Sequence, residues 1–427
     1  MQTSKKIITS TMVAGALVMQ TTTGNGQGTV SVDASSDEAI HPFHFHASQA
    51  DLDDLRRRIL ATKWPDKETV TDFSQGVPNA TIQALAKYWS NNYDWRKIET
   101  KINSYPNFIT KIDGLNIHFI HVRSKHKNAL PIIITHGWPG SVIEQLKIIG
   151  PLTDPTAYGG KAEDAFDVVI PSMPGYGFSQ KPTNTGWGPQ RIANAWIALM
   201  KRLGYNKFVA QGGDWGAVIT DFMAVQSPEN LLAIHVNMPG AIPANVDAAA
   251  FSGAPAPSGL SDEEKRSFDE LSFFYKHVYY AFEMGTRPQT LVGLADSPVG
   301  LASFLIDHDA RSLELISRSF AGKSEGLTRD DVLDNITLFW LTNTGISSSR
   351  LYWENKSAFF SPKGVTVPVA VSVFPDELYY TPRNWAEKAY PNLVYYNNKH
   401  DKGGHFAAWE QPEALVKDIR EGFKSLR

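Results

Sequence analysis

Five residues near the middle of the chain, Gly212–Gly216 (GGDWG), form the pattern of a turn that presents a nucleophile. A strand-like run, Phe208–Gln211, precedes the turn, and a helical run follows from Ala217. Such a turn is tight, so small residues must flank the central region, and glycines stand on both sides of Asp214. An aspartate is anionic at neutral pH and attacks carbon without a base to activate it. The same pattern also fits a plain helix start with Asp214 as its N-cap, and the turn alone does not decide.

A second turn, His136–Gly140 (HGWPG), directly follows the strand-like run Ile132–Thr135. A turn that begins with His-Gly at an early strand end supplies a backbone N–H to an oxyanion hole, the donors that stabilise a negatively charged oxygen in the transition state. The residue after the nucleophile supplies the other donor. The sequence therefore predicts an oxyanion hole formed by the backbone N–H groups of Trp138 and Trp215.

A histidine and two acids follow in the order that a triad with this turn requires, which is nucleophile, acid and then histidine. His405 lies in a GGHF segment near the C-terminus. The acid is expected after the strand-like run Val367–Val373, where Asp376 and Glu377 are adjacent. The spacing leaves both acids open as partners of His405.

Two other groups of reactive side chains fit less well. Gly322–Gly326 (GKSEG) also has the turn pattern, but a helical run precedes it, so we do not expect Ser324 to be a nucleophile. His44 and His46 alternate as metal ligands on a strand would, with His41 nearby. No cysteine joins them and no carboxylate is suitably spaced, so we interpret them as packed or solvated residues. We expect neither a metal nor an organic cofactor.

Short apolar strands alternate with helical runs over much of the chain, and this alternation favours an α/β fold with a mostly parallel sheet covered by helices on both faces. Phe108–Ile112 and Ile117–Val122 flank Asp113-Gly114 and predict a hairpin at the start of the sheet. The other expected elements are strands at Phe166–Pro171, Leu232–Met238 and Leu393–Tyr396, and helices at Ile143–Ile149, Ile192–Leu203 and Glu413–Leu426.

The alternation stops between about Pro239 and Phe360, where helical patterns dominate, which indicates a lid inserted in the core. Before the hairpin, Asp51–Thr62 and Ile82–Trp89 have helical patterns, and the aromatic residues there indicate an arm that packs on the rest of the protein. We therefore divide the chain into a leader (1–36), an N-terminal arm packing on core and lid (37–105), a first core part (106–239), a helical lid (240–360) and a second core part (361–427).

Composition excludes several classes of protein. The 427 residues carry a formal net charge of −3, which argues against a nucleic-acid partner, and the absence of cysteine excludes disulfides and thiolate chemistry. Lys5 and Lys6 precede a short apolar run, Ile7–Met19, as in a signal peptide. At ~1.5 Å per residue this run spans about 20 Å, short of a ~30 Å bilayer core. We expect export to the periplasm or medium, with a cytoplasmic location as the alternative, and no stable membrane span.

In combination, these motifs resemble those of the microsomal-type epoxide hydrolase family, from about Ile40 to the C-terminus. The resemblance implies an α/β-hydrolase fold with a helical lid and the N-terminal arm of that family. The motifs that carry it are DLDDLRRRILATKW (Asp51–Trp64), YDWR (Tyr93–Arg96), HGWPGS (His136–Ser141), PGYGFS (Pro174–Ser179), GGDWG, TRPQT (Thr286–Thr290), DSPVGLA (Asp296–Ala302), FPDE (Phe374–Glu377) and GGHFAAWE (Gly403–Glu410).

The resemblance also implies roles for the triad candidates. Asp214 matches the family nucleophile and His405 matches the general base. Glu377 matches the family acid, because it directly precedes the leucine of the FPxEL motif, so we choose it over Asp376.

Family members hold the epoxide oxygen with two lid tyrosines. The one six residues before the T-[RK]-P motif is Tyr280, with Tyr279 as its neighbouring alternative, and the one that ends an R-x-Y segment is Tyr352. The implied reaction converts an apolar epoxide to a vicinal diol through an ester of Asp214, which a water activated by His405 hydrolyses. The expected partners are the epoxide and water, and a homodimer is left open.

Two other functions are alternatives to epoxide hydrolysis. Haloalkane dehalogenation begins with the same aspartyl ester, and Trp215 beside the nucleophile suits a halide, but the two lid tyrosines favour an epoxide. A binding protein without catalysis would use the lid pocket for a hydrophobic ligand, and the complete set of catalytic residue types argues against it.

Overall fold

The computed structural model describes residues 38–227 and 229–427. The expected leader, 1–36, lies outside the described residues, as does the signal-like run on which the export prediction rests. Among the described residues, no helix combines the length and the apolar character that crossing a lipid bilayer requires.

One nine-stranded sheet runs through the described residues in the order β1-β2-β3-β5-β4-β6-β7-β8-β9. The three pairs β1–β2, β2–β3 and β3–β5 are antiparallel. The five other pairs, from β5–β4 along the sheet to β8–β9, are parallel, which confirms the mostly parallel sheet. The strands are β1 (His41–Pro42), β2 (Asn107–Ile112), β3 (Leu115–Val122), β4 (Leu130–Thr135), β5 (Phe166–Pro171), β6 (Phe208–Gly212), β7 (Leu231–Val236), β8 (Val369–Ser372) and β9 (Leu393–Asn397).

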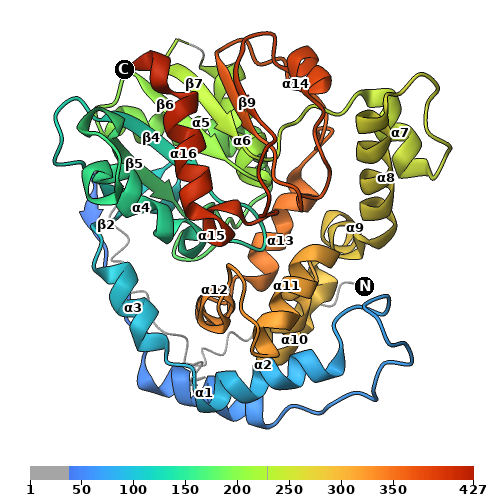
Figure 1. Ribbon diagram of the computed structural model, residues 1–427. Helices are drawn as coiled ribbons and strands as arrows, with labels where there is room; N and C mark the ends of the chain where they lie inside the picture. The colour runs from blue at the N-terminus through green and yellow to red at the C-terminus, as the bar shows by residue number, and fades with distance from the viewer. Residues whose placement is uncertain (1–37, 228) are drawn as a thin grey trace, which may run out of the picture.

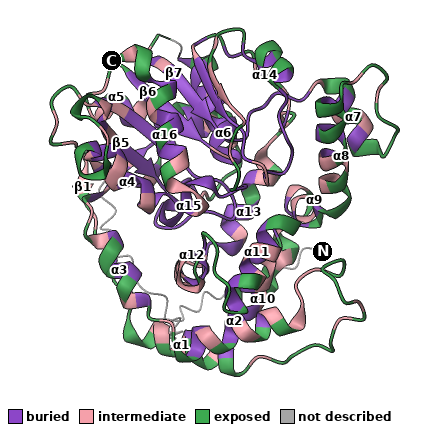
Figure 2. Cartoon of the chain, viewed as in Figure 1, coloured by how far each residue is buried: buried purple, intermediate pink, exposed green. Residues whose placement is uncertain are grey.

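Helices cover both faces of the sheet, with α4 and α16 on one face and α5 and α6 on the other (Figure 1). In α5, Ile192, Trp196 and Leu199 follow helical spacing and are buried, so the apolar stripe of the helix faces the sheet. Figure 2 shows the strands as the most continuously buried part of the molecule. The core helices are η1 (Val142–Gln145), α4 (Leu146–Thr153), η2 (Pro155–Tyr158), η3 (Ala162–Asp164), α5 (Pro189–Arg202), α6 (Trp215–Gln226), α14 (Arg383–Ala389), α15 (Ala407–Glu410), α16 (Pro412–Gly422) and η5 (Lys424–Leu426).

The chain between β7 and β8 is helical and forms the lid. Hydrogen bonds hold two of its helices on the core, because Asn335 Nδ2 in α12 donates to the Pro139 carbonyl at 2.7 Å and Ser347 Oγ in α13 donates to the Gly175 carbonyl at 2.6 Å. Both acceptors lie in loops that follow core strands. The lid elements are α7 (Ala244–Ser252), α8 (Asp262–His277), α9 (Tyr279–Thr286), η4 (Pro288–Ala295), α10 (Pro298–Ile306), α11 (Ala310–Phe320), α12 (Arg329–Leu341) and α13 (Gly345–Glu354).

The arm lies along the lid, on the side away from the sheet (Figure 1). Its helices are α1 (Gln49–Leu60), α2 (Asn79–Asn91) and α3 (Trp95–Asn103). Trp89 Nε1 donates to Thr337 Oγ1 at 3.0 Å, and the Tyr93 hydroxyl donates to Asp334 Oδ1 at 2.7 Å, so aromatic residues of the arm bind lid helix α12.

Two elements of the arm were not predicted. Strand β1 has two residues, too few for any periodic pattern, and it joins the core sheet beside β2. Helix α3 buries Trp95, Ile98 and Ile102, whose helical spacing is the signal that could have indicated it.

Candidate active site

Asp214 occupies a strained turn between β6 and α6. Its φ is 51°, in the left-handed region that residues other than glycine rarely adopt. A Cβ on Gly212 would lie 2.2 Å from the backbone of Gly216, and a Cβ on Gly216 would lie 2.0 Å from the carbonyl oxygen of Thr135. Only glycine fits at these two positions. The Asp214 side chain does not cap α6, so the plain N-cap interpretation does not describe this turn.

His405 and Glu377 lie beside Asp214. His405 Nδ1 is 2.6 Å from Glu377 Oε1, and His405 Nε2 is 3.7 Å from Asp214 Oδ2. All three side chains are buried. The carboxylate of Asp376 instead remains half exposed and lies 3.8 Å from Arg311. The structure therefore brings Glu377, and not Asp376, to the imidazole.

The charges in this group are strongly coupled. Burial favours the neutral imidazole, but the negative charges of Glu377 and Asp214 outweigh burial and raise the pKa of His405 to about 10. In the free protein at neutral pH, His405 is therefore an imidazolium between two carboxylates.

One of the two predicted oxyanion donors contacts Asp214 directly. The backbone N–H of Trp138 donates to Asp214 Oδ1 at 2.8 Å. The loop approaches this closely because its Gly137 has no side chain, and a Cβ there would lie 2.4 Å from the Asp214 Cβ. Trp215 is the first residue of α6, where the free N–H groups of a helix point toward negative charge. No hydrogen bond from the Trp215 N–H to Asp214 is found within the described structure.

Tyr280 and Tyr352 approach Asp214 from lid helices α9 and α13. Tyr280 stacks on Trp138 with ring centroids 4.8 Å apart, and the two tyrosine rings are 6.1 Å apart. Burial raises the pKa of both hydroxyls well above the usual value, so they remain protonated donors. Tyr279, the alternative to Tyr280, is 74% exposed.

Asp214 and the two lid tyrosines line one cavity of about 180 Å³. Asp214 and Trp215 line it from the core, and Tyr280 and Tyr352 line it from the lid. Most of the remaining wall is aromatic or aliphatic and includes Phe251, Phe274, Phe282, Phe359 and Phe360. The cavity therefore suits a small apolar molecule with one polar atom near the tyrosines.

The sequence analysis did not identify two residues beside the site, His308 and Asp309. His308, in the turn between α10 and α11, is buried, and its ring centroid lies 4.3 Å from that of His405. Its Nδ1 is 2.9 Å from Asp309 Oδ2. The signal in the sequence is Asp307-His308-Asp309, a histidine between two acids.

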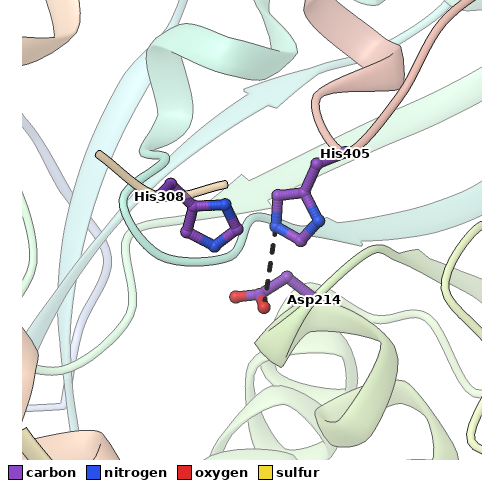
Figure 3. A group of neighbouring side chains, drawn as sticks. All are labelled: Asp214, His308 and His405. Atoms are coloured by element: carbon purple, nitrogen blue, oxygen red, sulfur yellow. Dashed lines mark ion pairs between the residues drawn. The ribbon is translucent and has the colours of Figure 1, made fainter. Parts of the chain in front are cut away.

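Asp214, His308 and His405 are the one cluster within the described residues whose ligand atoms could hold a metal ion, since these atoms lie within 4.8 Å of one another (Figure 3). Two of its three members, Asp214 and His405, belong to the acid–histidine group described above, so the cluster coincides with the candidate active site. The histidines of the arm are not part of the cluster, and His46 Nδ1 lies 3.0 Å from Glu99 Oε1 instead.

Ser324 lies outside this site. It is exposed, follows helix α11 rather than a strand, and its Oγ contacts Ser319 Oγ at 3.0 Å. The GKSEG segment therefore lacks the strand that precedes a nucleophile turn.

The parallel sheet, the strained strand-to-helix turn and the buried acid–histidine pair define the α/β-hydrolase class. Two family models match the chain. "Epoxide hydrolase N terminus" matches residues 40–145, and "alpha/beta hydrolase fold" matches residues 131–274.

Individual relatives extend this likeness over nearly the whole chain. A "Putative epoxide hydrolase" of Stigmatella aurantiaca is 50% identical over 91% of this chain and 86% of its own length. Epoxide hydrolase 1 of Oryctolagus cuniculus is 36% identical over 90% of this chain and 88% of its own length. The crystal structure of juvenile hormone epoxide hydrolase from Bombyx mori matches with a TM-score of 0.81 and 30% identity, over 94% of this chain and 98% of that one. The chain belongs to the microsomal-type epoxide hydrolase family.

Proposed function

We propose that this protein is an epoxide hydrolase that converts an apolar epoxide to a vicinal diol through a covalent ester of Asp214. The observation that carries the proposal is a buried carboxylate that shares one small cavity with two tyrosines, Tyr280, which is buried, and Tyr352, which is partly buried. An epoxide carbon is a strained electrophile, and its leaving group is an alkoxide. Opening the ring therefore needs a nucleophile on carbon and a proton donor on oxygen at the same time.

In the first step, an oxygen of Asp214 attacks the epoxide carbon and the ring C–O bond breaks. Oδ1 is held by the Trp138 N–H, so Oδ2 is the oxygen free to attack. Tyr280 and Tyr352 donate hydrogen bonds to the developing alkoxide, and one of them gives it a proton. The product of this step is an alkyl ester of Asp214.

In the second step, His405 activates water against the ester carbonyl. Asp214 is one of the anions that raise the pKa of His405, so ester formation removes that charge and lowers this pKa. The His405 imidazolium then gives up its proton, which restores the tyrosine that protonated the alkoxide. The neutral imidazole, oriented by Glu377, takes a proton from water. The backbone N–H groups of Trp138 and Trp215 stabilise the oxyanion. A serine nucleophile would form an ether instead, which offers no carbonyl to water.

The alternative substrate is an alkyl halide. The indole N–H of Trp215 is buried beside Tyr352 and forms no hydrogen bond of good geometry within the described structure, and such a donor would suit a halide. The two lid tyrosines and membership of the epoxide hydrolase family favour the epoxide.

The experiment that tests the covalent step is repeated turnover of an aryl epoxide in ¹⁸O-labelled water. Each cycle replaces one carboxylate oxygen of the nucleophile, so label should accumulate in the peptide that contains Asp214. The Asp214→Asn variant, incubated in the same way for a time too short for deamidation, is the control without ester formation. Label that enters the diol and never this peptide would refute the covalent mechanism.

A further inference from the structure

The site contains a second histidine–carboxylate pair besides His405 and Glu377. His308 Nδ1 faces Asp309 Oδ2 at 2.9 Å, as His405 Nδ1 faces Glu377 Oε1 at 2.6 Å. The two imidazole rings lie at an interplanar angle of 32°. Figure 3 shows a nitrogen of each ring turned toward the carboxylate of Asp214. The lid thus supplies the pair of His308 and Asp309, which resembles the pair of His405 and Glu377 in the core.

The Nε2 atom of His308 has no hydrogen-bond partner within the described residues. Nε2 is buried, the residue is 3% exposed, and no described group forms a hydrogen bond with this atom. A buried polar atom left in this way is destabilising, so its position points to a ligand.

The state of this nitrogen follows from its neighbours. Although burial alone would raise it, the hydrogen bond from His308 holds the pKa of Asp309 at about 2, so Asp309 is an anion. The anion keeps the imidazole proton on Nδ1. Burial is the main cause that lowers the pKa of His308, and it persists when His405 is neutral, so the ring is neutral in the hydrolytic step. Its Nε2 is therefore a hydrogen-bond acceptor.

We propose that His308 accepts the second hydrogen of the hydrolytic water and so directs the water oxygen at Cγ of the Asp214 ester. This inference rests on the covalent mechanism proposed above. A water has two hydrogens, and attack requires that a lone pair point at the carbon. With His405 Nε2 accepting one hydrogen and His308 Nε2 the other, both hydrogens are fixed and a lone pair is left for Cγ.

The step balances with His308 neutral throughout. As the water oxygen bonds to Cγ, one proton passes to His405 Nε2 and the carbonyl electron pair moves onto Oδ1. Collapse of this intermediate breaks the bond between Cγ and the ester oxygen, and the departing diol oxygen takes the proton from His405. The second hydrogen stays on the new carboxyl oxygen, bonded to His308, and leaves when Asp214 ionises again.

The test must separate hydrogen bonding from packing, because the His308 ring also lies 5.1 Å from Tyr280 and 6.0 Å from Trp138. His308→Phe keeps a ring and removes the acceptor, whereas His308→Gln supplies an acceptor without the ring. Asp307→Asn is the matched control, because Asp307 is exposed on the same turn.

Rapid-quench mass spectrometry with excess aryl epoxide measures ester formation and ester hydrolysis separately. We expect His308→Phe to slow hydrolysis about tenfold, as for one lost hydrogen bond, so that the ester accumulates while its formation changes little. The glutamine variant should recover part of the hydrolysis rate, and Asp307→Asn should match the unmodified protein.

The outcomes distinguish the two proposals. If the unmodified protein forms no ester, the covalent mechanism is wrong and this inference fails with it. If the ester forms and His308→Phe hydrolyses it at the normal rate, or slows formation and hydrolysis equally, only the role of His308 is refuted. If His308→Phe does not fold, Asp309→Asn serves in its place, since it frees the imidazole proton to move to Nε2. Normal hydrolysis in that variant would also refute the role.

Discussion

Replacing Glu377 with glutamine removes one negative charge from the site and keeps the shape of the side chain. Glu377 Oε1 lies 2.6 Å from His405 Nδ1, and both residues are buried, so solvent cannot replace the lost interaction. Glu377 is the largest of the charges that raise the pKa of His405. The variant should therefore lower this pKa from about 10, which a titration of the His405 ¹⁵N signals would detect.

The size of the kinetic effect follows from the same bond. A hydrogen bond to a charged partner contributes about 1.5–3 kcal/mol, which corresponds to roughly 10- to 150-fold in rate. Loss of the anion also frees the wrong imidazole tautomer, and the corresponding change in serine proteases costs about 10⁴-fold. We expect Glu377→Gln to slow ester hydrolysis by about 10²–10⁴-fold. Ester formation should change little, because Asp214 needs no base.

The matched control is Asp376→Asn, a change of the neighbouring acid. Asp376 is half exposed and contacts Arg311 at 3.8 Å, so its loss should change stability by less than about 0.5 kcal/mol and leave hydrolysis near normal. Rapid-quench measurements on both variants would show the difference. Equal damage from the two substitutions, or normal ester hydrolysis in Glu377→Gln, would refute the assignment of Glu377.

The pKa of His405 also affects stability. Because the folded value, about 10, exceeds the ordinary value near 6.5, this group stabilises the fold fully below about pH 6.5 and progressively less as the pH rises toward 10. Urea unfolding of the unmodified protein and of Glu377→Gln at pH 6 and pH 9.5 should show a smaller pH-dependent loss in the variant, and an equal loss would contradict this reasoning.

Further outcomes follow from the lid tyrosines and the nucleophile turn. Tyr280→Phe and Tyr352→Phe together should abolish ester formation, whereas Tyr279→Phe, at a 74% exposed position, should not, and unchanged turnover in the double variant would contradict the tyrosine assignment. Gly216→Ala places a Cβ 2.0 Å from a carbonyl oxygen of β4 and should destabilise the fold by more than about 3 kcal/mol in urea unfolding. Gly293→Ala, where a Cβ meets nothing within 4 Å, is its control. Equal stability of the Gly216→Ala and Gly293→Ala variants would show that the backbone of the turn moves to accommodate the added methyl group.

The elements that the sequence predicted well are those whose requirements are local. Gly212 and Gly216 stand where a side chain would strike neighbouring backbone, so their spacing is a local signal of the turn, and the order of the later acid and histidine separates this turn from a plain N-cap. The choice between Asp376 and Glu377 is different in kind. Adjacent residues share a spacing but point in different directions, and only the three-dimensional path of the loop, or the family motif, separates them.

The pair of His308 and Asp309 could not be predicted because its meaning lies in a contact across the chain. His308 and His405 are about a hundred positions apart, and they meet only because the lid closes over the carboxyl ends of the strands. The sequence places this histidine between two acids, but it does not show whether a histidine in a turn of the lid is buried or solvated. Local patterns do not predict the order of the strands for the same reason, since β5 lies between β3 and β4 in the sheet.

The arm, the lid and the oxyanion loop are connected through helix α12. Trp89 and Tyr93 of the arm bind Thr337 and Asp334, which flank Asn335 on that helix. Asn335 in turn bonds the Pro139 carbonyl and accepts a hydrogen bond from the Ser141 hydroxyl, on the loop whose Trp138 N–H holds Asp214. A donor in an oxyanion hole is effective only if it is fixed before charge develops. No described residue of the arm lines the cavity, so the contacts of the arm reach the site only through the helix that holds this loop.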